Sequence, residues 1–262
     1  MVAARRLDNL KNYLFLASKF RNSYELIRAF RSGPPCDTAV MWNGNRVFHP
    51  KDRAGFVGTI LELWKDHCYT REDFYHPQAG DQVVDAGAHV GLFSLSMAFE
   101  NPECRVLALE PFEENYECLV ENLHQAGVTN VIALRCALGG SQEQAFMQSV
   151  GTRSIDHLLQ DEPTEDGQAV PVISLGGILA KLGVERVAML KMDVEGAEFD
   201  AFSEAKDEEL VCFERIAMEY HDNLRPGTLE LIQDRLAKTH DIVIEPTFDR
   251  GYGILLAKLK TL

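Results

Sequence analysis

Apolar residues recur every three or four positions near the start of the chain, from Leu7 through Leu14 and Phe20 to Ile27. This spacing predicts an amphipathic helix that ends at the glycine and prolines of residues 33–35. We expect it to pack on the main domain or on a partner subunit, giving a homo-oligomer; a lid over the substrate is the alternative. Two further elements are predicted before residue 80: a hairpin over 39–42 and 46–48, and a helix over 56–67.

From residue 80 onward, short apolar runs alternate with helical periods, which is typical of a parallel sheet with helices on both faces. The predicted strands are 82–86, 105–110, 131–136, 187–193 and 215–220, and the predicted helices are 90–100, 113–126, 173–182, 197–207 and 227–239. Residues 241–245 and 253–258 predict a terminal antiparallel pair. The fold class is therefore α/β, a mostly parallel seven-stranded sheet with a C-terminal antiparallel hairpin. That arrangement is typical of methyltransferases rather than of dehydrogenases.

The domain organisation follows from this change of pattern. Residues 1–79 form an extension, a cap or an oligomer contact, and residues 80–262 form the main domain. Residues 139–171 interrupt that domain with a polar stretch that has no clear period. An insertion of this length is usually functional or disordered.

The turn after the first predicted strand reads Asp85-Ala86-Gly87-Ala88-His89-Val90-Gly91. A strand, a glycine turn and a helix start together form a cradle for a nucleotide. Dinucleotide sites need glycine at the third position, where the pyrophosphate approaches, and here that position is His89. S-adenosylmethionine (SAM) is therefore favoured over NAD or FAD. The predicted contacts are Gly87, Ala88, His89 and Gly91, while Asp85 either holds the turn or reaches the amino group of the cofactor.

Glu110 ends the second predicted strand. A carboxylate at that point accepts hydrogen bonds from the ribose hydroxyls of a nucleoside.

Acidic residues also follow the fourth and fifth strands, at the edge where ligands of such sheets bind. Asp193 stands on the fourth strand, whereas Glu195 and Glu198 begin the next helix, where at least one serves as a cap. Glu219 and His221 share one face of the fifth strand. We expect Asp193 or His221 to act as a general base, with Glu219 orienting His221; a purely structural histidine is the alternative. The same residues would suit magnesium, but no ligand spacing demands a metal, and none is expected.

The charge and the cysteine content of the chain limit its expected binding partners and its expected cellular location. The formal net charge is −14, which disfavours nucleic acid and anionic membranes. The six cysteines show no paired spacing, which favours buried free thiols and a cytoplasmic location. No apolar stretch reaches the length of a membrane span, and the first residues do not form a signal peptide.

From about residue 59 to the C-terminus, the chain resembles the FkbM-type family of SAM-dependent methyltransferases. The resemblance is carried by the segments 80–91, Glu110-Pro111 with Asn115, Ala137-Leu138-Gly139, 190–198 and Glu219-Tyr220-His221, with 61–64 and Tyr69 upstream. It implies a class I, Rossmann-like methyltransferase fold, cofactor contacts at Pro111, Asn115, Ala137 and Asp193, and a methyl ether formed on a hydroxyl of a natural product or sugar. The chain departs from the family at His89, where the family usually has asparagine, and at Ser174-Leu175-Gly176-Gly177, where it usually has Leu-Asp.

The methyl acceptor is expected to be a small molecule, with peptide and carboxylate acceptors left open as alternatives. Arg153 and Ser154 at the centre of the insertion, together with Glu195, are the predicted acceptor contacts. Two other functions remain as alternatives: an NAD-dependent Rossmann oxidoreductase, and a SAM-binding protein without catalysis.

Overall fold

The central feature of the molecule is a seven-stranded sheet with the order β12-β13-β11-β10-β3-β4-β5. The computed structural model describes residues 2–31, 35–71, 73–149, 157–160, 163, 167–246 and 251–261. The five parallel strands are β3 (Gln82–Ala86), β4 (Arg105–Leu109), β5 (Val131–Leu134), β10 (Met189–Met192) and β11 (Arg215–His221). β13 (Tyr252–Leu259) lies antiparallel between β11 and β12 (His240–Pro246). The predicted fold class, with its terminal antiparallel pair, is confirmed.

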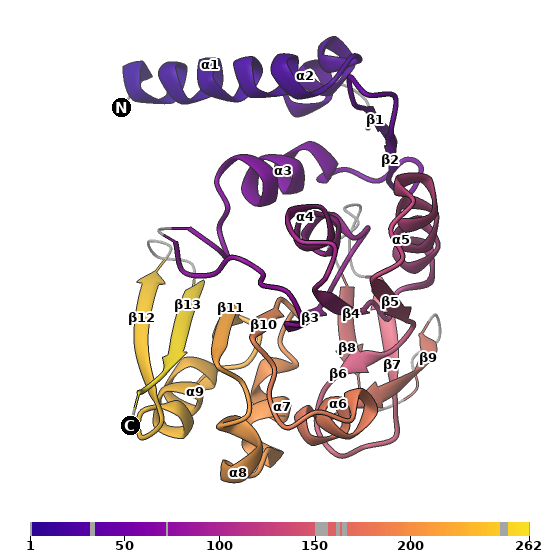
Figure 1. Cartoon of the computed structure of the whole chain (residues 1–262). Coiled ribbons are helices and arrows are strands. Elements are labelled where there is room, and N and C mark those ends of the chain that lie inside the picture. The colour runs from indigo at the N-terminus through magenta and orange to yellow at the C-terminus, as the bar shows by residue number, and fades with distance from the viewer. Residues whose placement is uncertain are drawn as a thin grey trace.

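Helices cover both faces of this sheet (Figure 1). On one face lie α4 (Leu92–Glu100) and α5 (Glu113–Ala126), and on the other lie α6 (Leu175–Leu182), α7 (Glu198–Glu204), α8 (Asp207–Leu210) and α9 (Thr228–Leu236). The central strands are buried on both faces, which explains why their sequences read as apolar runs and not as alternating patterns. The carboxyl ends of the parallel strands therefore meet at one edge, where the sequence places its acidic residues.

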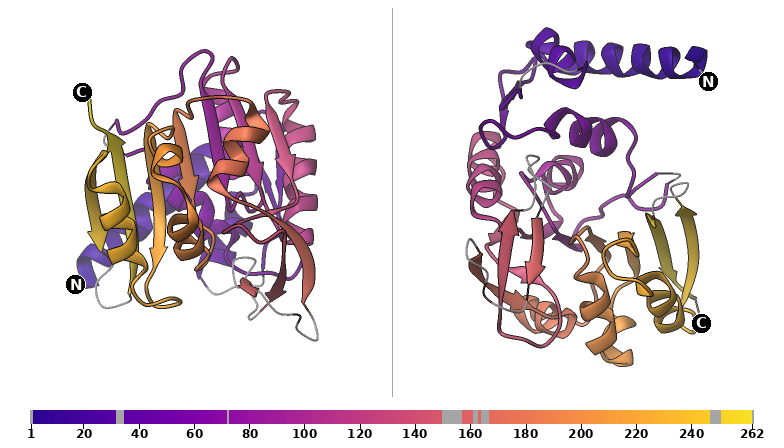
Figure 2. Two further views of the ribbon diagram at one scale, coloured as in Figure 1. Left: turned by 90° about the horizontal axis from the view of Figure 1, so that it is seen from below. Right: turned by 180° about the vertical axis from the view of Figure 1, so that it is seen from behind.

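The extension lies over the face that carries α4 and α5 (Figure 2). It consists of α1 (Val2–Lys19), α2 (Ser23–Arg31), the antiparallel strands β1 (Thr38–Val40) and β2 (Arg46–Phe48), α3 (Phe56–Ile60) and a π-helical turn, η1 (Leu61–Lys65). Hydrogen bonds from the Trp64 indole to the Leu92 carbonyl and from the Phe48 amide to Asn122 attach it to the sheet domain. Its role as a cap and its contact with a partner subunit stay predictions.

The single helix predicted from Leu7 to Ile27 is wrong, because the chain breaks between α1 and α2. The Arg21 amide donates to the Val40 carbonyl, and Asn22 bonds the backbone of Thr38 and of Val40. These bonds to β1 replace helical ones. An apolar period does not register such a break, since Phe20 and Leu26 on either side are both fully buried.

The polar stretch at 139–171 and the residues beside it form strands that the sequence pattern did not predict. β6 (Ala137–Leu138), β9 (Gln168–Ile173), β7 (Gln144–Ser149) and β8 (His157–Gln160) form a second sheet in that order. Ala145, Met147 and Val170 are buried, whereas the residues next to them in sequence are exposed or half-buried, so this small sheet has only a narrow apolar face.

All six cysteines are free thiols; Cys104 and Cys136 are buried, and the other four are half-buried. No helix within the described part of the chain is long and apolar enough to cross a membrane.

Candidate functional site

A pocket with an empty volume of about 610 Å³ opens at the carboxyl ends of β3, β4 and β10. Its lining combines residues from the predicted nucleotide turn with residues from the acidic edge: Gly87, His89, Glu110, Pro111, Phe112, Asn115, Ala137, Leu138, Met147, Asp193, Val194, Glu195 and Ala197. Eight of these were predicted as cofactor or acceptor contacts. Residues far apart in sequence are thus brought to one cavity, as the parallel topology requires.

The turn requires glycine at residue 87 for a steric reason that the sequence alone does not show. Gly87 has a φ of +73°, and a Cβ added there would lie 1.7 Å from the Asp193 carbonyl oxygen. The Asp193 amide also donates to the Ala86 carbonyl, at 3.0 Å. Glycine is therefore needed so that the turn can lie directly against the end of β10.

His89 has a φ of +52°, in the left-handed region. Histidine and asparagine are among the few residue types that adopt this conformation readily. The departure from the usual asparagine therefore preserves the backbone of the turn. The His89 ring meets the ring of His49 edge-on, with centroids 5.4 Å apart, so it touches the extension as well as the pocket.

Glu110 is buried at the pocket wall with 5% of its surface exposed. One carboxylate oxygen accepts from the His89 amide at 2.7 Å, and the other accepts from the Phe112 amide at 3.0 Å and the Asn115 side chain at 3.4 Å. Burial raises the pKa of Glu110 to about 7, although these hydrogen bonds lower it. The backbone thus fixes the carboxylate where the nucleoside was predicted to bind.

Asp85 lies outside the pocket lining and is fully buried. Its carboxylate accepts from the Ser94 hydroxyl at 2.7 Å and lies 3.3 Å from the ammonium of Lys191. That ammonium also donates to the carbonyl oxygen of Gly87. These contacts favour the first of the two roles predicted for Asp85, holding the turn. The contact with the amino group of a cofactor stays a prediction.

Ala88 and Gly91 also lie outside the lining. Ala88 is buried in an apolar cluster with Leu95 and Leu119, and a Cβ added at Gly91 would lie 2.5 Å from the side chain of Leu119. Both residues pack the turn against the helices α4 and α5. Arg153 and Ser154 lie outside the described residues.

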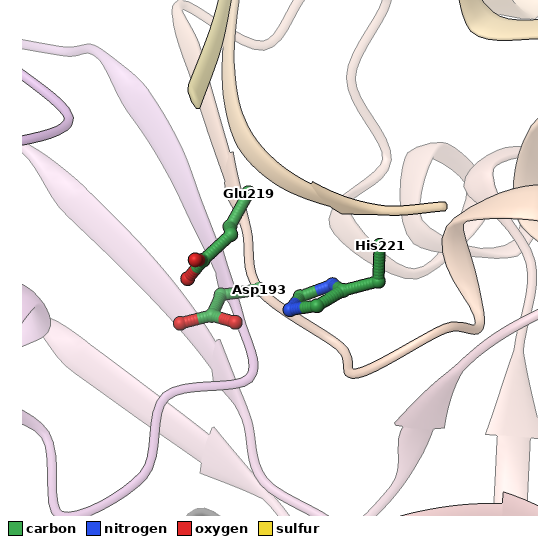
Figure 3. A group of neighbouring side chains, drawn as sticks. All are labelled: Asp193, Glu219 and His221. Atoms are coloured by element: carbon green, nitrogen blue, oxygen red, sulfur yellow. The ribbon is translucent and has the colours of Figure 1, made fainter. Parts of the chain in front are cut away.

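Beyond the turn, the side chains of Asp193, Glu219 and His221 converge (Figure 3). One ligand-type atom from each lies within 4.8 Å of the others. The Tyr69 hydroxyl donates to Asp193 at 3.1 Å. We call Asp193, Glu195, Glu219 and His221 the acidic cluster. The three residues predicted as catalytic are therefore brought together, but only Asp193 also lines the pocket.

Glu219 was predicted to orient His221, but the residue that does so is Glu198. Glu198 is fully buried, and its carboxylate lies 2.8 Å from Nδ1 of His221, while Nε2 lies 3.4 Å from Glu195. Glu198 comes from the start of α7, and the packing of that helix beside β11 creates the pair. Burial by itself lowers the pKa of His221, but the hydrogen bond and charge of Glu198, with Glu195 and Asp193, outweigh it and raise the pKa to about 9.

The carboxylates of the acidic cluster disfavour one another's charge. Burial, followed by the charge of Asp193, raises the pKa of Glu195 to about 8 and that of Glu219 to about 7. Glu195 also has a φ of +51°, an unusual backbone conformation for a residue of its type. Such an arrangement, strained and crowded with like charges, is more typical of a functional site than of a structural one.

Phe112, Leu138, Met147, Val194, Ala197, Glu198 and Lys191 contribute to the site without having been predicted. Met147 comes from β7, so the inserted sheet forms part of the pocket wall. One sequence signal could have identified Lys191: it is a lysine within an apolar run. A lysine buried in this way requires a counter-charge nearby.

The known proteins to which this chain is similar are methyltransferases. Residues 85–250 match the model of the methyltransferase FkbM domain. The chain is 28% identical over 207 residues to methyltransferase sdnD of Sordaria araneosa, covering 66% of this chain and 79% of the relative. It is 24% identical over 216 residues to the 31-O-demethyl-FK506 methyltransferase FkbM of Streptomyces tacrolimicus, covering 71% of this chain and 82% of the relative.

Among solved structures, the fold is similar to that of a putative rRNA-methylase from Clostridium thermocellum. The TM-score is 0.50 at 11% sequence identity, and the alignment covers 76% of this chain and 96% of that one. At this identity the likeness concerns the fold alone.

Proposed function

The chain belongs to the FkbM methyltransferase family, and we propose that it transfers the methyl group of SAM to a hydroxyl group of a small molecule. The observation that supports this most directly is the position of Asp193. Asp193 lines the pocket and lies directly against the glycine turn, where a base would meet a hydroxyl aligned with the donor.

The pocket residues fit a nucleoside at the turn end. Glu110 is buried and fixed by backbone amides, and its Oε2, which accepts from the His89 amide, can accept a further hydrogen bond from a ribose hydroxyl. Phe112, Leu138 and Met147 give the adjoining wall an apolar surface suited to a base. Gly87 and His89 line the same cavity and would lie beside the polar part of the donor.

Bound SAM supplies a methyl group on a sulfonium sulfur: the acceptor oxygen forms a C–O bond, the C–S bond breaks, and its electron pair stays on sulfur. The hydroxyl proton must leave to a base. Ionising an alcohol with a pKa near that of water in advance would cost about 12 kcal/mol at neutral pH. We therefore place proton removal within the transfer step itself, where a positioned base contributes about 10²- to 10⁴-fold.

Asp193 is the proposed base. The residue lines the pocket, and the Tyr69 hydroxyl donates to one of its carboxylate oxygens. His221 is the weaker candidate of the two predicted, because it lies outside the lining and carboxylates flank both of its ring nitrogens. We assign His221 a positioning role within the acidic cluster.

A small-molecule acceptor fits the charge of the site better than RNA does. The whole chain has a net charge of −14, and Asp193 and Glu195 stand at the pocket itself. A phosphate backbone would meet repulsion there, whereas RNA-binding sites are positively charged. We further propose that residues 1–79 cap the acceptor side of the main domain, supported by the contact between His49 and His89.

The test is a transfer assay with SAM labelled in its methyl group. The acceptors offered are matched panels of alcohols, vicinal diols, phenols and sugars, with amines, carboxylic acids and RNA alongside. We expect label only in the hydroxyl panels. Label in amines or RNA would overturn the acceptor assignment. Binding of S-adenosylhomocysteine without transfer to any panel would favour the non-catalytic alternative, and binding of NAD in its place would favour an oxidoreductase.

A further inference from the structure

We propose that Asp193, Glu219 and His221 bind a divalent metal ion of the magnesium or manganese class beside the pocket. The role assigned to the ion, but not its binding, rests on the proposed function.

The geometry of the three side chains suits an ion. Asp193 follows β10, and Glu219 and His221 lie two residues apart on β11, so the pairing of these strands fixes all three side chains. Their ligand-type atoms lie within 4.8 Å of one another, and Figure 3 shows them directed into one space. Ligands on opposite sides of an ion with bonds of about 2.1 Å are about 4.2 Å apart, so small side-chain adjustments would complete the set.

His221 is held in the way that metal-binding histidines are held. A histidine ligand usually bonds a carboxylate or carbonyl through its second nitrogen, which fixes the ring and the tautomer. Here Glu198, fully buried, bonds Nδ1 at 2.8 Å. Nε2 lies 3.4 Å from the Glu195 carboxylate. Because the pKa of His221 is raised to about 9, the ion would displace a proton from Nε2 when it binds. The second oxygen of Glu198 has no hydrogen-bond partner within the described part of the chain.

Glu219 provides an independent observation. Its carboxylate is half-buried and forms no hydrogen bond or ion pair with any described residue, yet it points toward the carboxylate of Asp193. Two carboxylates that face each other with no bonded donor between them repel, and an interposed cation converts the repulsion into attraction. Lys191 acts on Glu219 through its charge alone, because its ammonium contacts Asp85 and the carbonyl of Gly87.

The donor set selects the class of ion. Carboxylate oxygens suit magnesium, calcium and manganese, and one imidazole is compatible with manganese as well. No thiolate is part of the set. Bound here, the ion would coordinate the acceptor oxygen and lower the pKa of its hydroxyl, which charge stabilisation by a metal does for water. Asp193 would then be a ligand through one carboxylate oxygen, and its other oxygen would receive the proton as the C–O bond forms and the C–S bond breaks.

The test is a titration of the metal-free full-length protein with MnCl₂, followed by the electron paramagnetic resonance signal of free Mn²⁺. We expect one Mn²⁺ to bind and to be displaced by MgCl₂. Glu219→Gln should weaken binding by at least about tenfold, because it replaces one charged ligand and keeps its shape. Glu62→Gln removes an equal, exposed charge that also acts on Glu219, and should change the affinity by less than about threefold.

Two results would overturn the site: no Mn²⁺ bound by the wild type at millimolar concentration, or equal weakening by both variants, which would indicate only diffuse attraction. Calorimetry with S-adenosylhomocysteine on the same samples separates this proposal from the proposed function. If that ligand binds and Mn²⁺ does not, the metal site fails and methyl transfer stands. If Mn²⁺ binds and the ligand does not, the proposed function fails.

Discussion

The two ends of the pocket hold their carboxylates in opposite ways. At the turn end, Glu110 stands alone and accepts from two backbone amides and one side-chain amide. At the other end, the carboxylates of the acidic cluster face one another, and only His221 and Tyr69 provide side-chain donors among the described residues. A carboxylate fixed by the backbone is suited to hold a ligand that never changes. A crowded cluster is suited to a step in which charge moves or a cation enters.

Removing the charge of Asp193 should have the largest effect on methyl transfer, and this effect should be confined to the end of the pocket at the acidic cluster. We expect Asp193→Asn to lower methyl transfer by about 10²- to 10⁴-fold, since the variant can neither take up the proton nor supply an anionic ligand. Affinity for S-adenosylhomocysteine should change by less than about threefold. Transfer is measured with labelled SAM on the acceptor found in the panel, and affinity by calorimetry. A variant with near-normal turnover would show that the acidic cluster is not where the chemistry occurs.

Truncating Glu110 should have an intermediate effect, confined to the turn end. A hydrogen bond to a charged group contributes about 1.5–3 kcal/mol, so Glu110→Ala should weaken S-adenosylhomocysteine binding by about 10- to 100-fold. Glu113→Ala, which removes an exposed glutamate of the same region that pairs with Arg135, is the control and should bind normally. Circular dichroism of both variants tests whether the fold is kept. Equal affinities in the two variants would remove Glu110 from the binding site.

Acidification should produce a smaller effect at the same end. With its pKa raised to about 7, Glu110 gains a proton as the pH falls through 7, and it then accepts hydrogen bonds from ligand hydroxyls less well. If only the ionised form binds, affinity should be constant above about pH 8 and fall by about tenfold at pH 6. Glu110→Gln should bind more weakly and show no such dependence. Calorimetry across this range checks the prediction; a slope that persists in Glu110→Gln would assign the titration to another group.

The sequence predicted the strands and helices of the seven-stranded sheet because the signals for them are local. Strands buried on both faces read as apolar runs, and the turn between β3 and α4 carries its glycines in seven consecutive residues. The site was predicted as far as strand ends determine it. Pairs that depend on packing between distant elements were missed: Glu198 reads as a helix cap, and only the approach of α7 to β11 brings it to His221. The inserted strands were missed because their narrow apolar face gives no clear alternation, and the break before α2 because its cause lies in β1.

The contact between Gly87 and Asp193 restricts how this enzyme could change over evolution or be redesigned. A single hydrogen atom at Gly87 is all that separates the turn from the Asp193 carbonyl, so any side chain there would push the end of β10 away. In the proposed mechanism, donor recognition and proton removal thus depend on the same backbone contact, so a change at one would disturb the other. New acceptor preferences must then arise in the surrounding walls, in the inserted sheet and the N-terminal extension, which can diverge while that contact stays the same.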